Sequence, residues 1–244
     1  RLGNAFQSCR WPSGVSSNTT GRPLDERGDP TDGPALPLDP DGRAAALFAD
    51  SPHALASGPG SKTWAVLLDD WDDARPEMLV WLAPDATVLP PHVHQTRDET
   101  FEAVEGELTV VVDGEPRALS PGESRTVDPG VEHNFRNDTD GFVAFRVEPP
   151  WAKTVETQYT VFGCDHEGKF GDDGGYGEPG PLHGLVSMEA LSAETRISGP
   201  PHVVQRAAWA TVGRLARALG HRAVEQRFLD DDYWRRTVEQ PTLS

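Results

Sequence analysis

Residues 90–137 read PPHVHQTRDETFEAVEGELTVVVDGEPRALSPGESRTVDPGVEHNFRN. This stretch holds three histidines and a nearby glutamate: His92, His94, Glu99 and His133. Imidazole nitrogen binds zinc, copper, iron and nickel, and a carboxylate adds a hard, negatively charged ligand. Four such ligands leave one or two positions open on a five- or six-coordinate metal. An open position separates a reactive metal site from a structural one.

Short apolar runs surround these residues and are separated by turn signals, among them Glu105-Gly106, Asp113-Gly114 and Pro121-Gly122. Asp-Gly between two apolar runs is a strong hairpin signal. Regularly spaced short strands with such turns predict a β-sandwich or barrel. We expect strands over residues 63–68, 78–83, 92–94, 100–104, 107–112, 117–119, 124–127, 134–136 and 142–147.

Strand alternation predicts how the four candidate ligands point. His92 and His94 are two residues apart, so both rings leave the same face of a strand. Glu99 shares its face with Phe101 and Ala103, and His133 shares its direction with Phe135 and Asn137. If the strands face one another in a barrel, the four ligands converge in a largely apolar cavity. The candidate cavity residues are Phe101, Ala103, Phe135 and Asn137, of which Asn137 better fits a side chain that fixes a turn.

The spacing forms two blocks. The first is His-Val-His, four residues, Glu99, six residues and Gly106; the second is Pro129-Gly130, two residues, His133, three residues and Asn137. These blocks resemble the two motifs of the cupin family, and the resemblance covers roughly residues 62–148. It implies a double-stranded β-helix, or jelly roll, that binds one divalent metal.

By position, the resemblance implies His92, His94, Glu99 and His133 as the metal ligands. Two positions depart from the family pattern. Asp128 stands where a proline is usual, and Glu102 stands where an aromatic residue is common. Neither departure removes a ligand.

Cupins with this quartet include dioxygenases, isomerases, oxalate-degrading enzymes and proteins without known catalysis. We expect a dioxygenase-like enzyme that uses one divalent ion (Fe, Mn, Ni, Cu or Zn) on a small organic molecule. Glu99 is the candidate catalytic base. The alternatives are a non-catalytic small-molecule sensor and a sugar isomerase or epimerase. The isomerase is less favoured, because Phe101, Ala103 and Phe135 offer neither acid/base nor anion-binding groups.

The composition predicts three regions. Residues 1–60 are rich in Gly, Pro, Ser and Asp, and we expect a disordered tail there, with Ala44 to Phe48 as a short helix or docking strand. Residues 61–150 form the predicted barrel. Residues 151–244 form a helical extension, with helices expected over 156–164, 182–191 and 205–219 and a frayed end from residue 229.

The last of these helices is amphipathic. Its apolar residues recur at three- and four-residue steps, so we expect its apolar face to pack against the barrel or against a second subunit. A homodimer is therefore a reasonable expectation. The stripe consists of Val204, Ala208, Val212, Leu215 and Leu219.

The net charge of the chain limits the classes of partner that it can bind. The 244 residues carry a formal charge of −17, which repels nucleic acid phosphate and anionic membranes, so we expect a small-molecule ligand. The chain has few lysines beside many arginines, which fits either a halophile or a GC-rich genome. With two cysteines, Cys9 and Cys164, no apolar run of membrane length and no signal-peptide pattern, we expect a cytoplasmic protein. The other five histidines lack ligand spacing and are expected at the surface or in loops.

Overall fold

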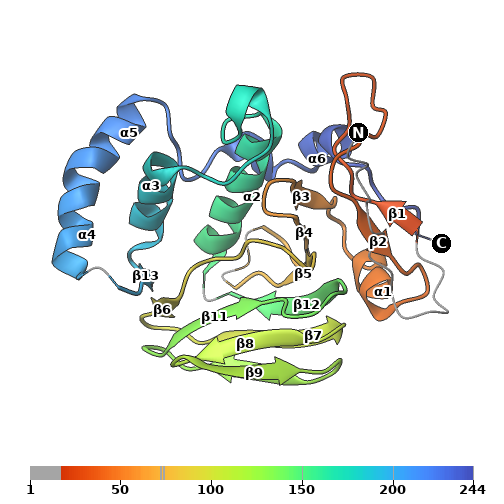
Figure 1. The fold of residues 1–244 in the computed structure, drawn as a ribbon, viewed down its shortest axis with the longest axis horizontal. Helices are drawn as coiled ribbons and strands as arrows, with labels where there is room; N and C mark the ends of the chain where they lie inside the picture. Colours follow the sequence, from red (N-terminus) through yellow and green to blue (C-terminus); the bar gives the residue numbers. More distant parts are fainter. Residues whose placement is uncertain (1–17, 72, 74, 150, 200, 244) are drawn as a thin grey trace, which may run out of the picture.

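The computed structural model describes residues 18–71, 73, 75–149, 151–199 and 201–243. Its centre is a jelly roll of two antiparallel sheets, with helices at one side (Figure 1). The six-stranded sheet has the order β10 (Ser124–Val127), β7 (Glu99–Glu105), β12 (Val143–Glu148), β5 (Met78–Leu82), β4 (Thr63–Leu67) and β3 (Ala56–Gly58). The five-stranded sheet has the order β13 (Thr195–Ile197), β6 (His92–His94), β11 (Glu132–Arg136), β8 (Leu108–Val112) and β9 (Glu115–Leu119).

The predicted jelly roll is confirmed, and the nine predicted strands form at nearly the predicted positions. The Asp-Gly hairpin illustrates the local cause. Asp113 and Gly114 both have positive φ, 51° and 81°, as a two-residue primed turn requires. Val112 of β8 consequently pairs with Glu115 of β9.

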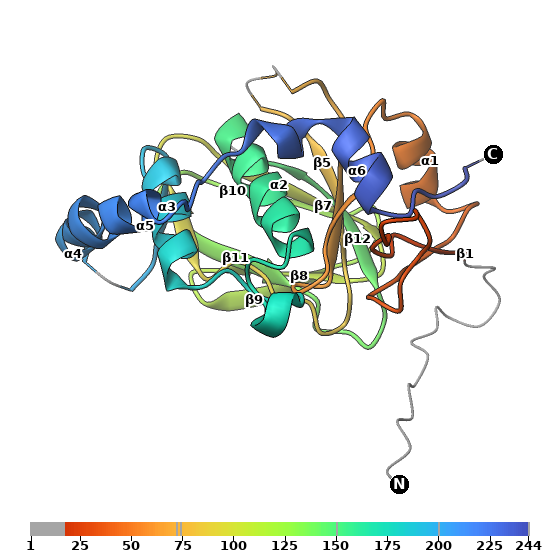
Figure 2. The same cartoon turned by 90° about the horizontal axis from the view of Figure 1, so that it is seen from above.

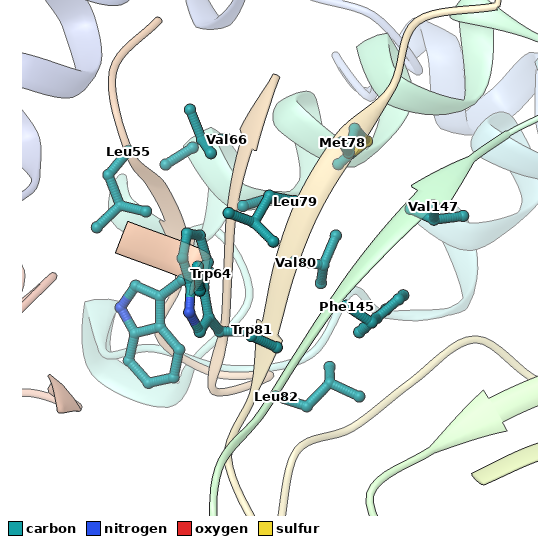
Figure 3. Packing of buried hydrophobic residues seen from close by; sticks show 14 of the residues in the cluster. Leu55, Trp64, Val66, Met78, Leu79, Val80, Trp81, Leu82, Phe145 and Val147 are labelled. Atoms are coloured by element: carbon teal, nitrogen blue, oxygen red, sulfur yellow. The ribbon is translucent and has the colours of Figure 1, made fainter. Parts of the chain in front are cut away.

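Strands β4 and β5 are buried along their whole length, because they are covered on both faces. Figure 3 shows the aliphatic and aromatic side chains packed around them. On the outside, the backbone N–H of Leu67 donates to the hydroxyl of Tyr159 at 3.0 Å. Phe48 packs edge-on against Trp81, with ring centroids 6.2 Å apart. Burying both faces explains why these strands read as continuous apolar runs rather than alternating ones.

The structure corrects the prediction of a disordered tail for residues 18–60. This segment forms β1 (Asn18–Thr20), β2 (Leu36–Leu38), helix α1 (Arg43–Ala49) and β3. Leu36 and Ala44 are fully buried, and the Trp64 indole N–H donates to the Gly21 carbonyl at 2.8 Å. The apolar residues of the segment are sparse, but they dock on the sheet that the later strands build. Residues 1–17 lie outside the described residues.

The C-terminal extension is helical, as predicted. Its helices are α2 (Ala152–His166), α3 (Pro181–Leu191), α4 (His202–Ala208), α5 (Arg214–Ala218) and α6 (Asp231–Thr237). A π-helical turn, Trp209–Gly213, joins α4 to α5, and two 3-10 turns cover Asp172–Gly174 and Gln226–Leu229. Helix α2 crosses the molecule beside the barrel, and α4 and α5 lie at the far end (Figure 2).

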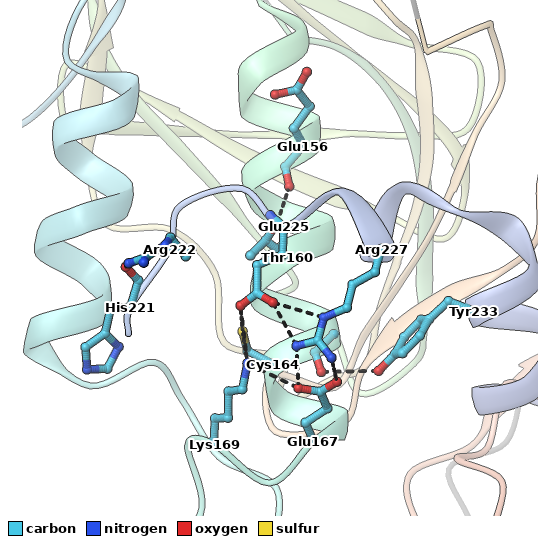
Figure 4. Close-up of polar contacts among 11 residues, drawn as sticks. Glu156, Thr160, Cys164, Glu167, Lys169, His221, Arg222, Glu225, Arg227 and Tyr233 are labelled. Carbon is cyan, nitrogen blue, oxygen red and sulfur yellow. Dashed lines mark hydrogen bonds and ion pairs between the residues drawn. The ribbon is translucent and has the colours of Figure 1, made fainter. Parts of the chain in front are cut away.

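The chain end from residue 229 to residue 243 is ordered, which overturns the prediction of a frayed end. Trp234 and Val238 are fully buried. Beside them, Arg227 bridges Glu167 and Glu225 in the polar network of Figure 4. The C-terminal end also contacts the start of the described chain. Arg22 donates two hydrogen bonds to the Glu239 carboxylate, each of 2.8 Å.

The apolar stripe of α4 and α5 was predicted to pack either on the barrel or on a second subunit. It does not pack on the barrel. Val204, Leu215 and Leu219 are 54%, 57% and 63% exposed. The opposite face of this helix, with Trp209 and Gly213 buried, lies against α3. Packing against a second subunit stays a prediction. Among the described residues, no helix is long and apolar enough to cross a membrane.

Candidate metal centre

The barrel brings together the four residues that the sequence singled out. His92 and His94 come from β6, Glu99 opens β7 in the other sheet, and His133 lies on β11. One ligand atom of each residue lies within 4.8 Å of the others. The cross-strand register explains part of this convergence, because His133 pairs directly with His92.

All four side chains are withdrawn from water. Their exposed fractions are 5% for His92, 2% for His94, 5% for Glu99 and 2% for His133. The three imidazole rings form a tight triangle, with centroid separations of 4.6 to 5.1 Å. Burying three polar rings this close together costs free energy unless hydrogen bonds or a bound ion replace the lost contacts with water.

Glu99 supplies that compensation in the described residues. Its Oε2 lies 2.8 Å from Nε2 of His133 and 3.2 Å from Nε2 of His94. Burial alone opposes ionisation of Glu99, but the hydrogen bonds from His133 and His94 outweigh it and lower the pKa of Glu99 to about 2. Burial likewise opposes protonation of His133, yet its hydrogen bond to Glu99 and the charge of Glu99 raise the pKa of His133. For His92, burial outweighs the charge of Glu99 and lowers the pKa to about 4.

Each histidine has a partner on its other ring nitrogen. Nδ1 of His92 lies 2.9 Å from the Pro90 carbonyl, and Nδ1 of His133 lies 3.0 Å from the Val131 carbonyl. A carbonyl only accepts, so these rings carry a proton on Nδ1 and turn Nε2 inward. This arrangement orients a metal-binding histidine and fixes its tautomer.

The donor set therefore fits a divalent transition metal. Two rings have Nε2 fixed as the inward atom, the third has Nε2 beside Glu99, and Glu99 stays ionised at neutral pH. Nitrogen donors with one carboxylate suit Fe, Mn, Ni, Cu and Zn alike, so the ligand set does not select one metal.

Aromatic side chains border the quartet on one side. The ring of Phe101 lies 6.2 Å from that of His133 and 5.5 Å from that of Phe135. Phe145, which the sequence did not single out for the site, continues this layer 5.1 Å from Phe135. Ala103 is fully buried and pairs with Phe145 across the sheet. The surroundings of the site are apolar on this side, and a cavity lined by these residues stays a prediction.

Asn137 has a local role. Its amide nitrogen donates to the carbonyls of Gly141 (2.7 Å) and Leu82 (3.3 Å), and its amide oxygen accepts from the backbone N–H of Thr139 at 2.9 Å. These bonds occupy both ends of the amide within the turn before β12. They support the turn-fixing interpretation rather than a contact with a ligand.

Sequence reasoning missed two residues beside the centre. Thr195 places its Oγ1 2.9 Å from Nδ1 of His94, and Glu194 binds the loop between His94 and Glu99. Both come from the helical extension. Strand β13 has only three residues, too few to show a period, so the sequence held no signal for its pairing with β6.

A surface cavity of about 550 Å³ lies away from this centre and has an acidic lining. It contains none of the four ligand residues. Its lining consists of Pro52, Leu68, Asp69, Asp70 and Asp73.

Comparison with known proteins agrees with the cupin resemblance. The family model described as "Cupin domain" matches residues 78–146. No curated protein matches the chain. A sugar phosphate isomerase of the cupin superfamily from Silicibacter pomeroyi is 27% identical, over 39% of this chain and 67% of that one, with a TM-score of 0.33.

Two further solved structures are similar to part of the chain. The Cupin_2 domain of an XRE family transcriptional regulator from Enterobacter cloacae is 27% identical, over 35% of this chain and 92% of that one, with a TM-score of 0.31. A predicted oxalate decarboxylase from Thermotoga maritima is 17% identical, over 40% of this chain and 92% of that one, with a TM-score of 0.35. The family model, the two motifs expected from the sequence and the jelly roll agree that residues 78–146 form a cupin domain.

Proposed function

We propose that His92, His94, Glu99 and His133 bind one divalent metal ion, and that the protein is a dioxygenase-like enzyme for a small organic molecule. One observation carries the proposal: the four ligand atoms lie within 4.8 Å of one another in a buried site. The aromatic layer of Phe101 and Phe135 beside His133 favours an apolar or aromatic substrate.

A redox-active metal such as Fe(II), held by these four residues, would supply reactivity toward O2. The chain supplies orientation and exclusion of water. Pro90 and Val131 hold the tautomers of His92 and His133 through their carbonyls. The Glu99 carboxylate lies among the ligand nitrogens, with its Oε2 2.8 Å from Nε2 of His133 and 3.2 Å from Nε2 of His94. We therefore favour the ligand role for Glu99 over the role of catalytic base.

The sugar isomerase alternative is less well supported. Such chemistry needs acid/base groups and a cationic side chain for an anionic substrate. Phe101 and Phe135, which border the quartet, offer neither kind of group. The alternative of a non-catalytic sensor needs only the metal site. The experiment below distinguishes it from the enzyme.

The test has two stages. Protein loaded with Fe(II), Mn(II), Ni(II), Cu(II) or Zn(II) is analysed for bound metal, with His94→Ala as the site variant and His202→Ala, on α4, as the matched control. We expect one metal per chain in the wild type and the control, and loss of the metal in His94→Ala. Absence of metal in the wild type would contradict the proposal.

Oxygen consumption is then followed with an electrode against catechols, flavonols and other small aromatic compounds. We expect turnover with one redox metal and none in His94→Ala. Metal binding without oxygen uptake or product on any substrate class would support the sensor. Conversion of a sugar phosphate without oxygen uptake would support the isomerase.

A further inference from the structure

We infer that residues 192–197 of the C-terminal extension are a positioning element of the metal centre, with Thr195 orienting His94. The inference rests on the proposed metal binding and deepens it. It assigns a role to a segment outside the cupin motifs, about 100 residues downstream of the ligands that it contacts.

The ring partners of the three histidines differ in origin. His92 and His133 each use a backbone carbonyl two residues before themselves, at Pro90 and Val131. His94 instead uses the side-chain hydroxyl of Thr195, at 2.9 Å. Two ligands are therefore oriented by their own strands, and one depends on the extension.

The pairing of β13 with β6 places this hydroxyl. Thr195 lies directly opposite His94 in an antiparallel register, and Ile197 lies opposite His92. Thr195 is 6% exposed and His94 is 2% exposed, so water does not compete for the bond. A buried hydrogen bond to the outer nitrogen holds the ring orientation that the inner nitrogen needs to bind a metal.

The neighbouring residue secures the loop that leads to the fourth ligand. One carboxylate oxygen of Glu194 accepts from the backbone N–H groups of Thr96 and Arg97, both at 2.9 Å. The other accepts from the Thr96 hydroxyl at 2.6 Å, and the Glu194 carbonyl accepts from the N–H of Gln95 at 2.8 Å. Residues 95–98 join His94 to the strand of Glu99, and Glu194 binds the first three of them, so it holds the spacing between two ligands.

The test measures Co(II) affinity and the visible absorption of bound Co(II), which reports ligand geometry. Thr195→Val keeps the shape of the side chain and removes the hydroxyl, whereas Thr195→Ser keeps the hydroxyl. Thr20→Val is the matched control, because Thr20 is also a buried strand threonine, whose hydroxyl bonds the Glu239 carbonyl. We expect Thr195→Val to bind Co(II) roughly 10- to 100-fold more weakly, with shifted absorption bands. Thr195→Ser and Thr20→Val should resemble the wild type.

Glu194→Gln tests the same element independently and covers the case in which Thr195→Val does not fold. It should weaken Co(II) binding while the far-ultraviolet circular dichroism stays that of the wild type. Wild-type affinity and an unchanged Co(II) spectrum in the folded Thr195→Val or Glu194→Gln protein would overturn the inference and leave the metal site intact. A wild-type protein that binds no Co(II) would overturn the metal site itself, and the inference with it.

Discussion

Four histidines are buried among the described residues, three in the barrel and one in the helical extension, and the two places differ in what surrounds the rings. In the barrel, His92, His94 and His133 converge on the Glu99 carboxylate. In the helical extension, His183 is 2% exposed and packs against Phe170 at 4.9 Å, and its Nε2 has no hydrogen-bond partner among the described residues. Burial alone therefore does not mark a site. Convergence of several donors on one charge does.

The position of His183 also corrects an expectation. The histidines without ligand spacing were expected at the surface or in loops, but His183 lies on the buried face of α3. Burial lowers the pKa of His183 to about 4, and the nearby charges of His221 and Lys169 act in the same direction. It behaves as a neutral packing residue, whereas His133 lies beside a carboxylate that raises its pKa.

The largest expected effect comes from removing the charge on which the barrel histidines converge. Glu99→Gln leaves three buried imidazoles without a negative ligand, so divalent metal affinity should fall by more than about 100-fold, beyond the range typical of outer-sphere partners. Isothermal titration with Zn(II) or Fe(II) measures the change. Glu105→Gln, the same substitution at the other end of β7, is the control. Equal affinity in Glu99→Gln and the wild type would contradict the comparison.

Metal removal should affect the barrel through binding linkage. A ligand at 1,000 times its dissociation constant stabilises the folded state by about 4 kcal/mol, so chelation should lower the unfolding midpoint in denaturant. The same chelator should leave the midpoint of His94→Ala unchanged. If the chelator leaves the unfolding midpoint of the wild type unchanged, the quartet holds no metal under those conditions.

The smallest expected effect concerns His183 and pH. Its folded-state pKa of about 4 lies below the ordinary histidine value of about 6.5. The unfolded chain therefore binds more protons between these values, and the free energy of unfolding falls as pH drops from 6.5 to 4, by at most about 3 kcal/mol from this group. His183→Leu should flatten this part of the profile, whereas His202→Leu should not. An identical slope in His183→Leu and the wild type would contradict the assignment.

How far the sequence predicts this molecule depends on the range of the interaction. The His-Val-His pair and the Asp113-Gly114 turn are local patterns. Strand alternation predicted the direction of the four ligands, and the resemblance to the cupin motifs supplied the barrel in which they converge. Thr195 was out of reach, because a three-residue strand has no period and its partner lies about 100 residues away. Residues 18–60 were misjudged for a related reason. Composition averages over a segment, and a few residues such as Leu36 and Ala44 are enough to dock it.

The strand order of the five-stranded sheet also has a consequence for biosynthesis. Strand β6 lies between β11 and β13, so one of its two edges is closed only by a segment that is translated about 100 residues later. Until that segment leaves the ribosome, the edge of β6 offers unpaired backbone groups that another nascent chain could join. Between translation of β6 and of β13, this edge is therefore open to pairing with another chain.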